Sequence, residues 1–252
     1  MLAKRIMPCL DVKNGEVVKG INFIGLREVG DPVEMGAEYS RQGADELVYL
    51  DISASFEGRK TFTELVSAIS ERINIPFTVG GGISSFGDAA RLLDAGADKI
   101  TINTAAVNDP SLITRIASRY GSQFVVVAID ARKVGDASWQ VTTHGGNVLT
   151  DKELYSWVKE AEDRGAGEIL FTSMDHDGER KGYAVNEYAR LSELLSIPVI
   201  ASGGAGSVDD MAEVLTTGKA DAALAASIFH FGEIKIPDLK RQLAERQIPV
   251  RI

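Results

Sequence analysis

An internal repeat of about 122 residues constrains the fold of this chain more than any other feature. The segment IPFTVGGG, which starts at Ile75, matches IPVIASGG, which starts at Ile197. The segments ADELVYLDISAS (44–55) and AGEILFTSMDHD (166–177) match at the same offset. A unit of this length is too long for a solenoid repeat, which spans about 20–50 residues. We therefore predict two similar halves, covering about residues 1–121 and 122–252.

Short runs rich in Val and Ile alternate with longer segments of helical periodicity, which is typical of parallel strands joined by crossover helices. The predicted strands are Arg5–Asp11, Glu46–Asp51, Thr78–Gly81, Lys99–Asn103, Phe124–Asp130, Glu168–Ser173, Val199–Ser202 and Ala222–Ala226. The predicted helices cover about residues 32–43, 60–73, 86–95, 110–119, 152–165, 186–195, 208–217 and 237–246. No linker divides these units. The pattern predicts an α/β protein with one (β/α)8 TIM barrel domain over residues 1–252, built from two similar half-barrels.

Composition narrows the classes of function. With 27 basic and 36 acidic residues the net charge is −9, which disfavours non-specific nucleic-acid binding. Cys9 is the only cysteine, so no internal disulfide forms and a reducing compartment fits. No apolar run reaches the roughly 20 residues that span a membrane, and Asp11 interrupts the N-terminal apolar stretch too early for a signal peptide. We expect a cytoplasmic protein that binds neither nucleic acid nor membrane.

Two glycine-rich strand ends, one in each half, predict binding sites for phosphate. Gly81 and Gly82 precede the pair Asn103-Thr104, and at matching positions Gly203 and Gly204 precede Ala226-Ser227. Backbone N–H groups at a helix N-terminus point toward an anion, and glycine lets the backbone approach it closely. One such loop is explained equally well by a tight strand-to-helix turn, but the pair with matching hydroxyl partners favours phosphate. We expect a ligand with a phosphate at each end.

Carboxylates gather at the predicted C-terminal ends of the strands, where barrel enzymes carry their active sites. Asp11, Asp51 and Asp130 end strands, and Asp177 follows one. Carboxylates clustered in a cleft shift one another's pKa, although each of these side chains is also suited to capping the helix that follows. Asp11 and Asp130 end the first strand of each half, so we expect them to face each other across the ligand.

The segment between Val12 and Pro32 is much longer than the usual loop of about two to six residues. It contains four glycines and a shorter alternating stretch that includes Lys19. Two interpretations remain open from the sequence. The segment is either a lid that carries Lys19 toward the substrate or a surface hairpin whose lysine is solvated.

Four charged residues stand at the predicted starts of strands, where the lowest layer of a barrel is normally apolar. They are Arg5, Glu46, Lys99 and Glu168. One interpretation is a closed ring of ion pairs across the barrel floor, which is costly unless every charge is paired. The other is that the four side chains turn outward into solvent, and spacing alone does not decide between them.

Several common catalytic arrangements are missing from the sequence. His144, His176 and His230 lack the spacing of metal ligands. No serine or cysteine stands on a nucleophile elbow, and no G-x-G-x-x-G segment follows a strand. We therefore expect no metal, no other cofactor and no covalent nucleophile.

Long motifs extend along the whole chain, among them PCLDVKNGEVVKGINF (8–23), TVGGGI (78–83), INTAAV (102–107), VVVAIDAR (125–132) and GAGEILFTSMDHDG (165–178). Together they resemble the cyclase subunits of imidazole glycerol phosphate synthase, from histidine biosynthesis. The resemblance implies a lyase whose substrate is the bis-phosphorylated phosphoribulosyl-formimino-aminoimidazole carboxamide ribotide. Ammonia attacks this substrate and yields imidazole glycerol phosphate and aminoimidazole carboxamide ribotide. It also implies a glutaminase partner, a glutamine amidotransferase subunit docked on the N-terminal barrel face, whose ammonia passes through the ring of charged residues.

The resemblance also implies roles for individual residues. Asp11 and Asp130 would be the general acid and base, because ammonia addition, amine expulsion and ring closure each need a proton moved. Lys19 would close the lid on the substrate. The remaining binding residues fall into three groups: Asp177, Gly178, Gly203, Gly204, Ala226 and Ser227 at one phosphate, Gly82, Asn103 and Thr104 at the other, and Asp51, Thr172 and Ser202 as polar contacts within the barrel.

Two other functions remain open from the sequence. One is the phosphoribosyl-formimino isomerase of the same pathway, which shares the half-barrel repeat and both phosphate loops but typically begins its first strand with P-A-I-D-L. The other is a non-catalytic scaffold that binds and activates a glutaminase. Substitutions relative to the cyclase motifs, at Asn147, His176, Glu179 and Ala184, bear on loop geometry and turnover more than on the type of reaction.

Overall fold

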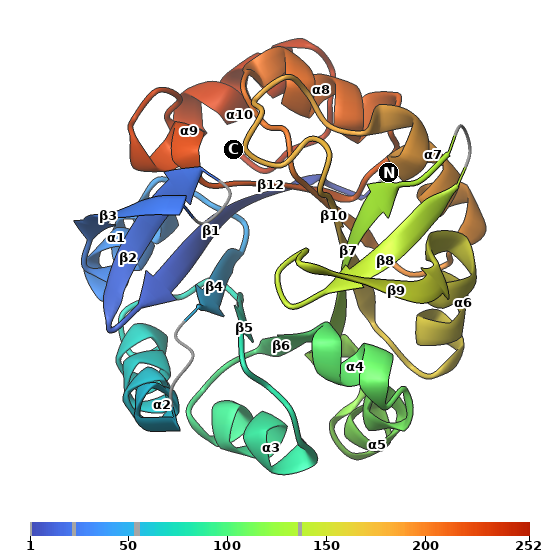
Figure 1. Ribbon diagram of the computed structural model, residues 1–252. Helices are drawn as coiled ribbons and strands as arrows, with labels where there is room; N and C mark the ends of the chain where they lie inside the picture. Colours follow the sequence, from blue (N-terminus) through green and yellow to red (C-terminus); the bar gives the residue numbers. More distant parts are fainter. Residues whose placement is uncertain (1, 22–23, 53–55, 136–137) are drawn as a thin grey trace.

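Eight parallel strands form a closed barrel in the computed structural model of the chain. The structure describes residues 2–21, 24–52, 56–135 and 138–252, with the backbone alone at 19–21, 24–26 and 56–61. The barrel strands are β1 (Arg5–Lys13), β4 (Leu47–Asp51), β5 (Phe77–Gly80), β6 (Lys99–Ile102), β7 (Val125–Lys133), β10 (Glu168–Ser173), β11 (Val199–Ser202) and β12 (Ala222–Ala225). They pair in the order β10-β11-β12-β1-β4-β5-β6-β7, and β7 also pairs with β10, which closes the ring (Figure 1). The predicted (β/α)8 barrel is confirmed.

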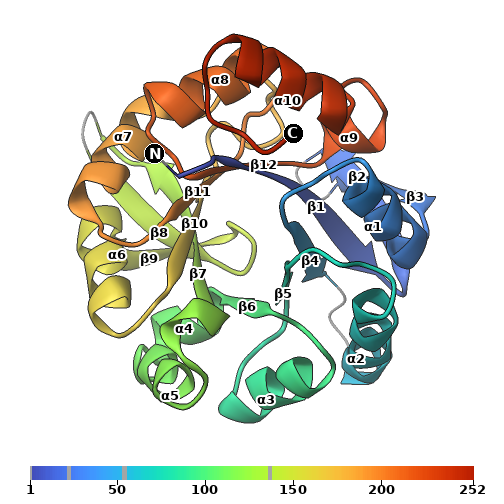
Figure 2. The ribbon, with the colours of Figure 1, turned by 180° about the vertical axis from the view of Figure 1, so that it is seen from behind.

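Helices enclose the barrel on its outside, as both views show (Figures 1 and 2). They are α1 (Pro32–Arg41), α2 (Phe56–Ser70), α3 (Phe86–Asp94), α4 (Thr104–Asn108), α5 (Ser111–Tyr120), the 3-10 helix η1 (Ser122–Phe124), α6 (Leu154–Asp163), α7 (Val185–Leu194), α8 (Val208–Thr216), α9 (Ser227–His230) and α10 (Ile236–Glu245). The short helices α4 and α9 were not among the predicted helices, because four or five residues are too few to show a helical period. Among the described residues, no helix has the length and apolar character needed to cross a membrane.

The first strand of each predicted half continues past the barrel rim into an antiparallel hairpin. β2 (Glu16–Ile21) pairs with β1 and with β3 (Ile24–Gly30), and β8 (Trp139–Thr143) pairs with β7 and with β9 (Val148–Glu153). The segment predicted as a long loop after the first strand is therefore largely strand. The predicted end of the fifth strand at Asp130 is also wrong, since β7 runs on to Lys133 to pair with β8. The sequence analysis did not predict β8 and β9.

Side chains alternate between two cores on the two faces of the barrel sheet. On β1, Met7 and Cys9 belong to the inner core inside the barrel, whereas Ile6 and Leu10 belong to the outer core against the helices. Both faces of a parallel sheet are covered, so its strands are apolar at nearly every position. Alternation therefore tells which side chains lie inside the barrel.

The pairing register of the first four barrel strands recurs in the last four. Leu50 pairs with Gly80 on β4 and β5, and Thr172 pairs with Ser202 on β10 and β11, with both partners 122 residues further on. The helices that follow are also capped alike. Ser85 accepts a hydrogen bond from the backbone N–H of the third residue after it, and so does Ser207, 122 residues later. This recurrence supports the proposal of two half-barrels.

A buried ion pair ties the last helix to the first strands. Lys240 of α10 lies 2.9 Å from the Asp45 carboxylate, and the two side chains are 6% and 2% exposed. Asp45 also accepts a hydrogen bond from the backbone N–H of Ile6 (2.8 Å), and the Lys240 ammonium donates to the Gly43 carbonyl. Removing one member of such a pair leaves an uncompensated buried charge.

We predict that Lys240→Met lowers the free energy of unfolding by about 3 kcal/mol, because Asp45 then remains buried without its main counter-charge. Urea unfolding followed by far-ultraviolet circular dichroism measures the change. The control is Arg241→Gln on the same helix, which removes a solvent-exposed pair with Asp238 and should cost less than about 0.5 kcal/mol. Equal effects of the two substitutions would contradict the prediction.

Candidate active site

Two aspartates lie on opposite sides of the barrel mouth. β1 and β7 are four strands apart in both directions around the ring, so they are diametrically opposed. Asp11 follows Cys9 in the inward alternation of β1, and Asp130 follows Ala128 in that of β7. Asp11 is buried and Asp130 is half-buried. The structure thus brings together, at the C-terminal end of the barrel, the two carboxylates singled out from the sequence.

The surroundings of Asp130 keep its carboxyl partly protonated near neutral pH. Burial raises the pKa of Asp130 to about 6, and the neighbouring Asp177 carboxylate acts in the same direction. Hydrogen bonds from Thr172 and from the Asn103 amide, whose Nδ2 donates to Oδ2 over 2.9 Å, act against this rise. A carboxyl group with a pKa near the operating pH suits general acid or base catalysis.

The first predicted phosphate cradle forms where β5 and β6 end. Gly81 and Gly82 follow β5 with φ angles of 95° and 64°, and α4 begins at Thr104 beside them. The Thr104 hydroxyl accepts a hydrogen bond from the backbone N–H of His144 over 3.1 Å. The turn between β8 and β9 therefore reaches this cradle.

The second predicted cradle forms where β11 and β12 end. Gly203 and Gly204 follow β11 with φ angles of 88° and 106°, and α9 begins at Ser227. The loop after β10 lies against this site, since a Cβ on Gly203 would come within 3.5 Å of the Cα of Asp177. Gly178, next along that loop, has a φ of 78°. The residues before the two short helices share one backbone conformation: Asn103 has φ −122° and ψ −86°, and Ala226 has φ −124° and ψ −75°.

Close backbone contacts require glycine in both cradles, whatever binds there. A Cβ on Gly81 would lie 2.0 Å from the Asp51 carbonyl oxygen, and one on Gly204 would lie 2.0 Å from the Gly182 carbonyl oxygen. Real Cβ contacts do not occur at such distances, so these glycines are explained by packing alone. The prediction of phosphate binding therefore depends on the N–H groups and hydroxyls at the starts of α4 and α9.

The polar contacts predicted within the barrel divide into two groups. Thr172 and Ser202 pair across β10 and β11 at inward positions, above the inner core. Asp51 alternates the other way: Leu50 packs against the inner core, and Tyr49 belongs to the outer one. Asp51 thus has the alternation of the outer positions of β4. Its contact with a ligand inside the barrel stays a prediction.

Lys19 lies on β2, where it pairs with Arg27 of β3 next to an irregularity in the register. Its side chain is outside the described part of the structure. The backbone shows a hairpin that extends β1 beyond the rim, which both the lid and the surface-hairpin interpretations accommodate.

The four charged residues at the strand starts form a closed ring of ion pairs across the barrel floor. Arg5 lies 2.8 Å from Glu46 and 3.0 Å from Glu168, and Lys99 lies 2.9 Å from Glu46 and 2.6 Å from Glu168. The four side chains are between 9% and 14% exposed, so the outward alternative is excluded. Burial by itself would raise the pKa of Glu168, but Arg5 and Lys99 hold that pKa below its ordinary value. Glu168 therefore stays charged at neutral pH, and so does Arg5, whose pKa is raised.

Three threonine and asparagine side chains extend from this ring toward Asp130. Thr78 is two residues from Gly80 on β5, and Thr101 is two residues from Lys99 on β6, so these residues share the inward face of their strands. Asn103 follows Thr101 in the same alternation. Within the described residues, the hydroxyl oxygens of Thr78 and Thr101 and the amide oxygen of Asn103 are buried without a hydrogen-bond partner. They offer polar contacts to a small molecule inside the barrel.

The three histidines bond to neighbouring side chains. His144 Nδ1 lies 3.0 Å from the hydroxyl of the residue before it, His176 Nδ1 lies 2.7 Å from Ser173 Oγ, and His230 Nδ1 lies 2.7 Å from Tyr39 Oη. Across the described residues, no three His, Cys, Asp or Glu side chains are grouped so as to hold a metal ion.

Sequence analysis did not predict that the β8–β9 turn contacts the first cradle. Its contact with Thr104 depends on the hairpin, although Gly145 and Gly146 between two strand-like runs are a hairpin signal. The substitution at Asn147 fits this turn, because its side-chain amide donates to the His144 carbonyl over 2.7 Å.

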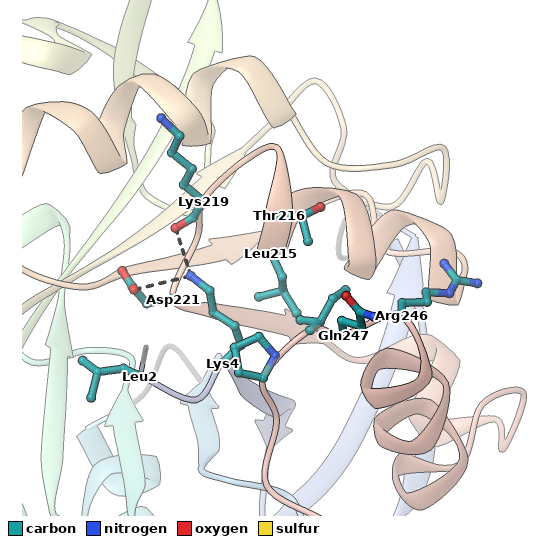
Figure 3. A pocket seen from close by; sticks show the side chains of 10 residues that line it. Leu2, Lys4, Leu215, Thr216, Lys219, Asp221, Arg246 and Gln247 are labelled. Atoms are coloured by element: carbon teal, nitrogen blue, oxygen red, sulfur yellow. Dashed lines mark hydrogen bonds and ion pairs between the residues drawn. The ribbon is translucent and has the colours of Figure 1, made fainter.

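A cavity of about 550 Å³ lies at the other end of the barrel, beside the start of β1 (Figure 3). Its Lys4 ammonium donates to the Ala220 carbonyl over 2.6 Å and lies 3.7 Å from the Asp221 carboxylate. The charge of this lysine is thus already neutralised, and neither of the two facing aspartates lines the cavity.

Comparison with known proteins places the chain among enzymes of one pathway. A model of the family "Histidine biosynthesis protein" matches residues 5–235. The chain is 60% identical over 252 residues to "Imidazole glycerol phosphate synthase subunit HisF" of Phocaeicola vulgatus, and 61% identical over 251 residues to the protein of that name from Bacteroides fragilis. It is 57% identical over 252 residues to that of Flavobacterium johnsoniae. Each match covers 100% of both chains.

We predict that Asp130→Asn stabilises the fold at pH 7.5 and that the gain disappears toward pH 4. The pKa of Asp130 is raised in the folded state, so ionising this carboxyl costs stability as pH rises from about 4 to 6. A pKa shift of this size corresponds to about 3 kcal/mol of folding free energy. Because Asp130 is only half-buried, we expect the substitution to gain about 1–2 kcal/mol. Urea unfolding at both pH values measures it.

The control is Asp88→Asn, for which the sign is opposite. Burial acts to raise the pKa of Asp88, but hydrogen bonds from Ser84 and Ser85 outweigh it and lower that pKa. This substitution should destabilise the protein at pH 7.5. A loss of stability for Asp130→Asn at pH 7.5 would contradict the assignment of a raised pKa.

Proposed function

The chain belongs to the histidine biosynthesis protein family, and we infer from this that it is the cyclase subunit of imidazole glycerol phosphate synthase. It uses ammonia to convert phosphoribulosyl-formimino-aminoimidazole carboxamide ribotide into imidazole glycerol phosphate and aminoimidazole carboxamide ribotide. Full-length identity of 56–61% to proteins of that name supports this function over the isomerase and the scaffold. The pathway and the relatives favour a cytoplasmic location.

The main support for the mechanism is that the line joining the two carboxylates crosses the line joining the two cradles. β5 is four strands from β11 around the ring, and β6 is four strands from β12. The two cradles are therefore diametrically opposed, like Asp11 and Asp130. A substrate held by a phosphate at each end then crosses the barrel mouth between the two carboxylates. In this geometry Gly82, Asn103 and Thr104 hold one phosphate, and Asp177 and Gly178 with the α9 start hold the other.

Acid–base chemistry follows from the two carboxylates. Ammonia attacks the carbonyl-type carbon, and the carbonyl oxygen must gain two protons, which the attacking nitrogen gives up, to leave as water. The departing carboxamide ribotide amine also needs a proton, while the attacking nitrogen loses protons. With a pKa of about 6, roughly one Asp130 in ten carries a proton at pH 7, so this residue is suited to donate. Asp11 is then placed to accept a proton on the opposite face.

In the proposed mechanism, ammonia reaches this site from the N-terminal end of the barrel. A glutaminase subunit docks on the N-terminal barrel face, and its product enters at the ring of Arg5, Glu46, Lys99 and Glu168. The unpartnered oxygens of Thr78 and Thr101 lie on the inner wall between the ring and Asn103, which donates to Asp130. Lys19, on the hairpin at the opposite rim, closes over the substrate in this proposal.

We predict that Asp11→Asn and Asp130→Asn each lower kcat by at least about 100-fold with little change in substrate affinity, because they move protons rather than hold phosphates. The assay follows loss of substrate absorbance in purified protein supplied with an ammonium salt at alkaline pH. Turnover of the wild type only when ammonium is present supports the cyclase. Aminoaldose turnover without ammonia would indicate the isomerase, and glutaminase activation without turnover the scaffold.

A gate role for the floor ring predicts different effects on two nitrogen sources. Lys99→Met leaves the Glu46 and Glu168 carboxylates facing each other with only Arg5 between them, which opens or distorts the ring. We expect glutamine-dependent turnover with the glutaminase bound to fall by about tenfold, while turnover with ammonium salt, which enters from solvent, falls less than about twofold. Equal loss with both nitrogen sources would assign the ring to stability alone.

A further inference from the structure

An ion pair joins two loops around the second cradle. The Arg180 guanidinium, in the loop after β10, contacts the Glu233 carboxylate, in the segment after α9. The first loop also carries Asp177 and Gly178, and the second follows directly on the helix that begins at Ser227. The side chains are 42% and 40% exposed, so the pair lies on the surface and adds little to global stability.

The first half of the sequence has no charged residue at the positions that match this pair. The residue 122 positions before Arg180 is Gly58, and the residue 123 positions before Glu233 is Pro110. The two halves therefore differ in sequence at both of these positions.

Backbone contacts transmit the position of Arg180 to the cradle. Gly182, two residues on, donates its N–H to the Gly204 carbonyl over 2.9 Å. The Arg180 carbonyl packs so closely on Gly206 that a Cβ there would lie 2.3 Å from it. Arg180 itself has a φ of 57°, in the left-handed region that costs a side-chain-bearing residue energy, so the loop needs contacts to hold it there.

Glu233, the partner of Arg180, lies in a segment that is hydrogen-bonded to α9. The backbone N–H of Phe231 bonds to the Ser227 carbonyl over 3.0 Å, and that of Ile234 bonds to the Ile228 carbonyl over 3.1 Å. Glu233 lies between these two bonds. Backbone hydrogen bonds on both sides of Glu233 thus connect its segment to α9.

We propose that the Arg180–Glu233 ion pair is a positioning pair that holds the two walls of the second cradle together, so that the two phosphate sites are inequivalent. The pre-ordered second cradle binds the phosphate end of a sugar phosphate more tightly than it would with free loops. This inference builds on the proposed function only in assigning phosphate to the cradles.

The test uses inorganic phosphate as the probe and does not require turnover. Amide NMR signals of Gly82 and Thr104 report on the first cradle, and those of Gly178 and Ser227 on the second. In Arg180→Gln and Glu233→Gln, the Kd at the second cradle should rise about twofold to fivefold, the size expected of one exposed ion pair, while the Kd at the first stays unchanged. The charge-swapped double variant Arg180→Glu/Glu233→Arg should restore the wild-type Kd.

The matched control is Lys219→Gln, which removes a comparably exposed ion pair with Glu193 away from both cradles. It should change neither Kd. With substrate and ammonium salt, the Arg180 and Glu233 variants should raise KM by the same factor and leave kcat unchanged. Equal changes at both cradles, no change at either, or no recovery in the charge swap would overturn the inference. Wild-type turnover without any phosphate-induced amide shifts would overturn it while leaving the ammonium-dependent function intact.

Discussion

Hydrogen bonding between β7 and β10 closes the sheet, and every proposed functional feature depends on that closure. Only in a closed ring do β1 and β7 stand opposite each other, with the strand pairs that carry the cradles on the two remaining sides. The same closure turns one face of every strand inward. Side chains on alternate residues then meet at the centre although they are far apart in the chain, as the pairs of Arg5 with Glu168 and Lys99 with Glu46 show.

The two halves repeat the same backbone arrangement. Strand registers, serine caps and the conformation before α4 and α9 all match, and α4 and α9 begin at two opposed points of the barrel. Glycine is required there because neighbouring carbonyls approach too closely for a side chain. A fold that repeats itself in this way suits a substrate with phosphate at both ends. The Arg180–Glu233 pair joins two loops at the second cradle, which is why we propose that the two phosphate sites are inequivalent.

Charged side chains inside this barrel are fully paired at one end and poorly stabilised at the other. At the floor, each of the four charged groups touches two of opposite sign, so the burial cost is offset by pairing. At the mouth, burial and then the nearby Asp177 carboxylate raise the pKa of Asp130, and its hydrogen bonds only partly offset this rise. A group that is poorly stabilised as an anion is one that gives and takes protons near neutral pH. Stability and proposed catalysis thus oppose each other at this residue.

Local patterns in the sequence were sufficient for the barrel itself. Strand and helix alternation is a property of short segments, and the barrel that it predicted is confirmed. Errors arose where a strand continues past the rim, as at Lys133, and where a helix is too short for its period to show, as at Thr104.

The sequence alone therefore determined the architecture and the rim at which the carboxylates gather, because the side-chain period of a strand is local. Tertiary structure alone decided that the floor charges pair with one another and that the β8–β9 turn reaches Thr104. Each of these depends on which strands become neighbours and in what register. Contacts of that kind join residues tens of positions apart, and no short segment specifies them.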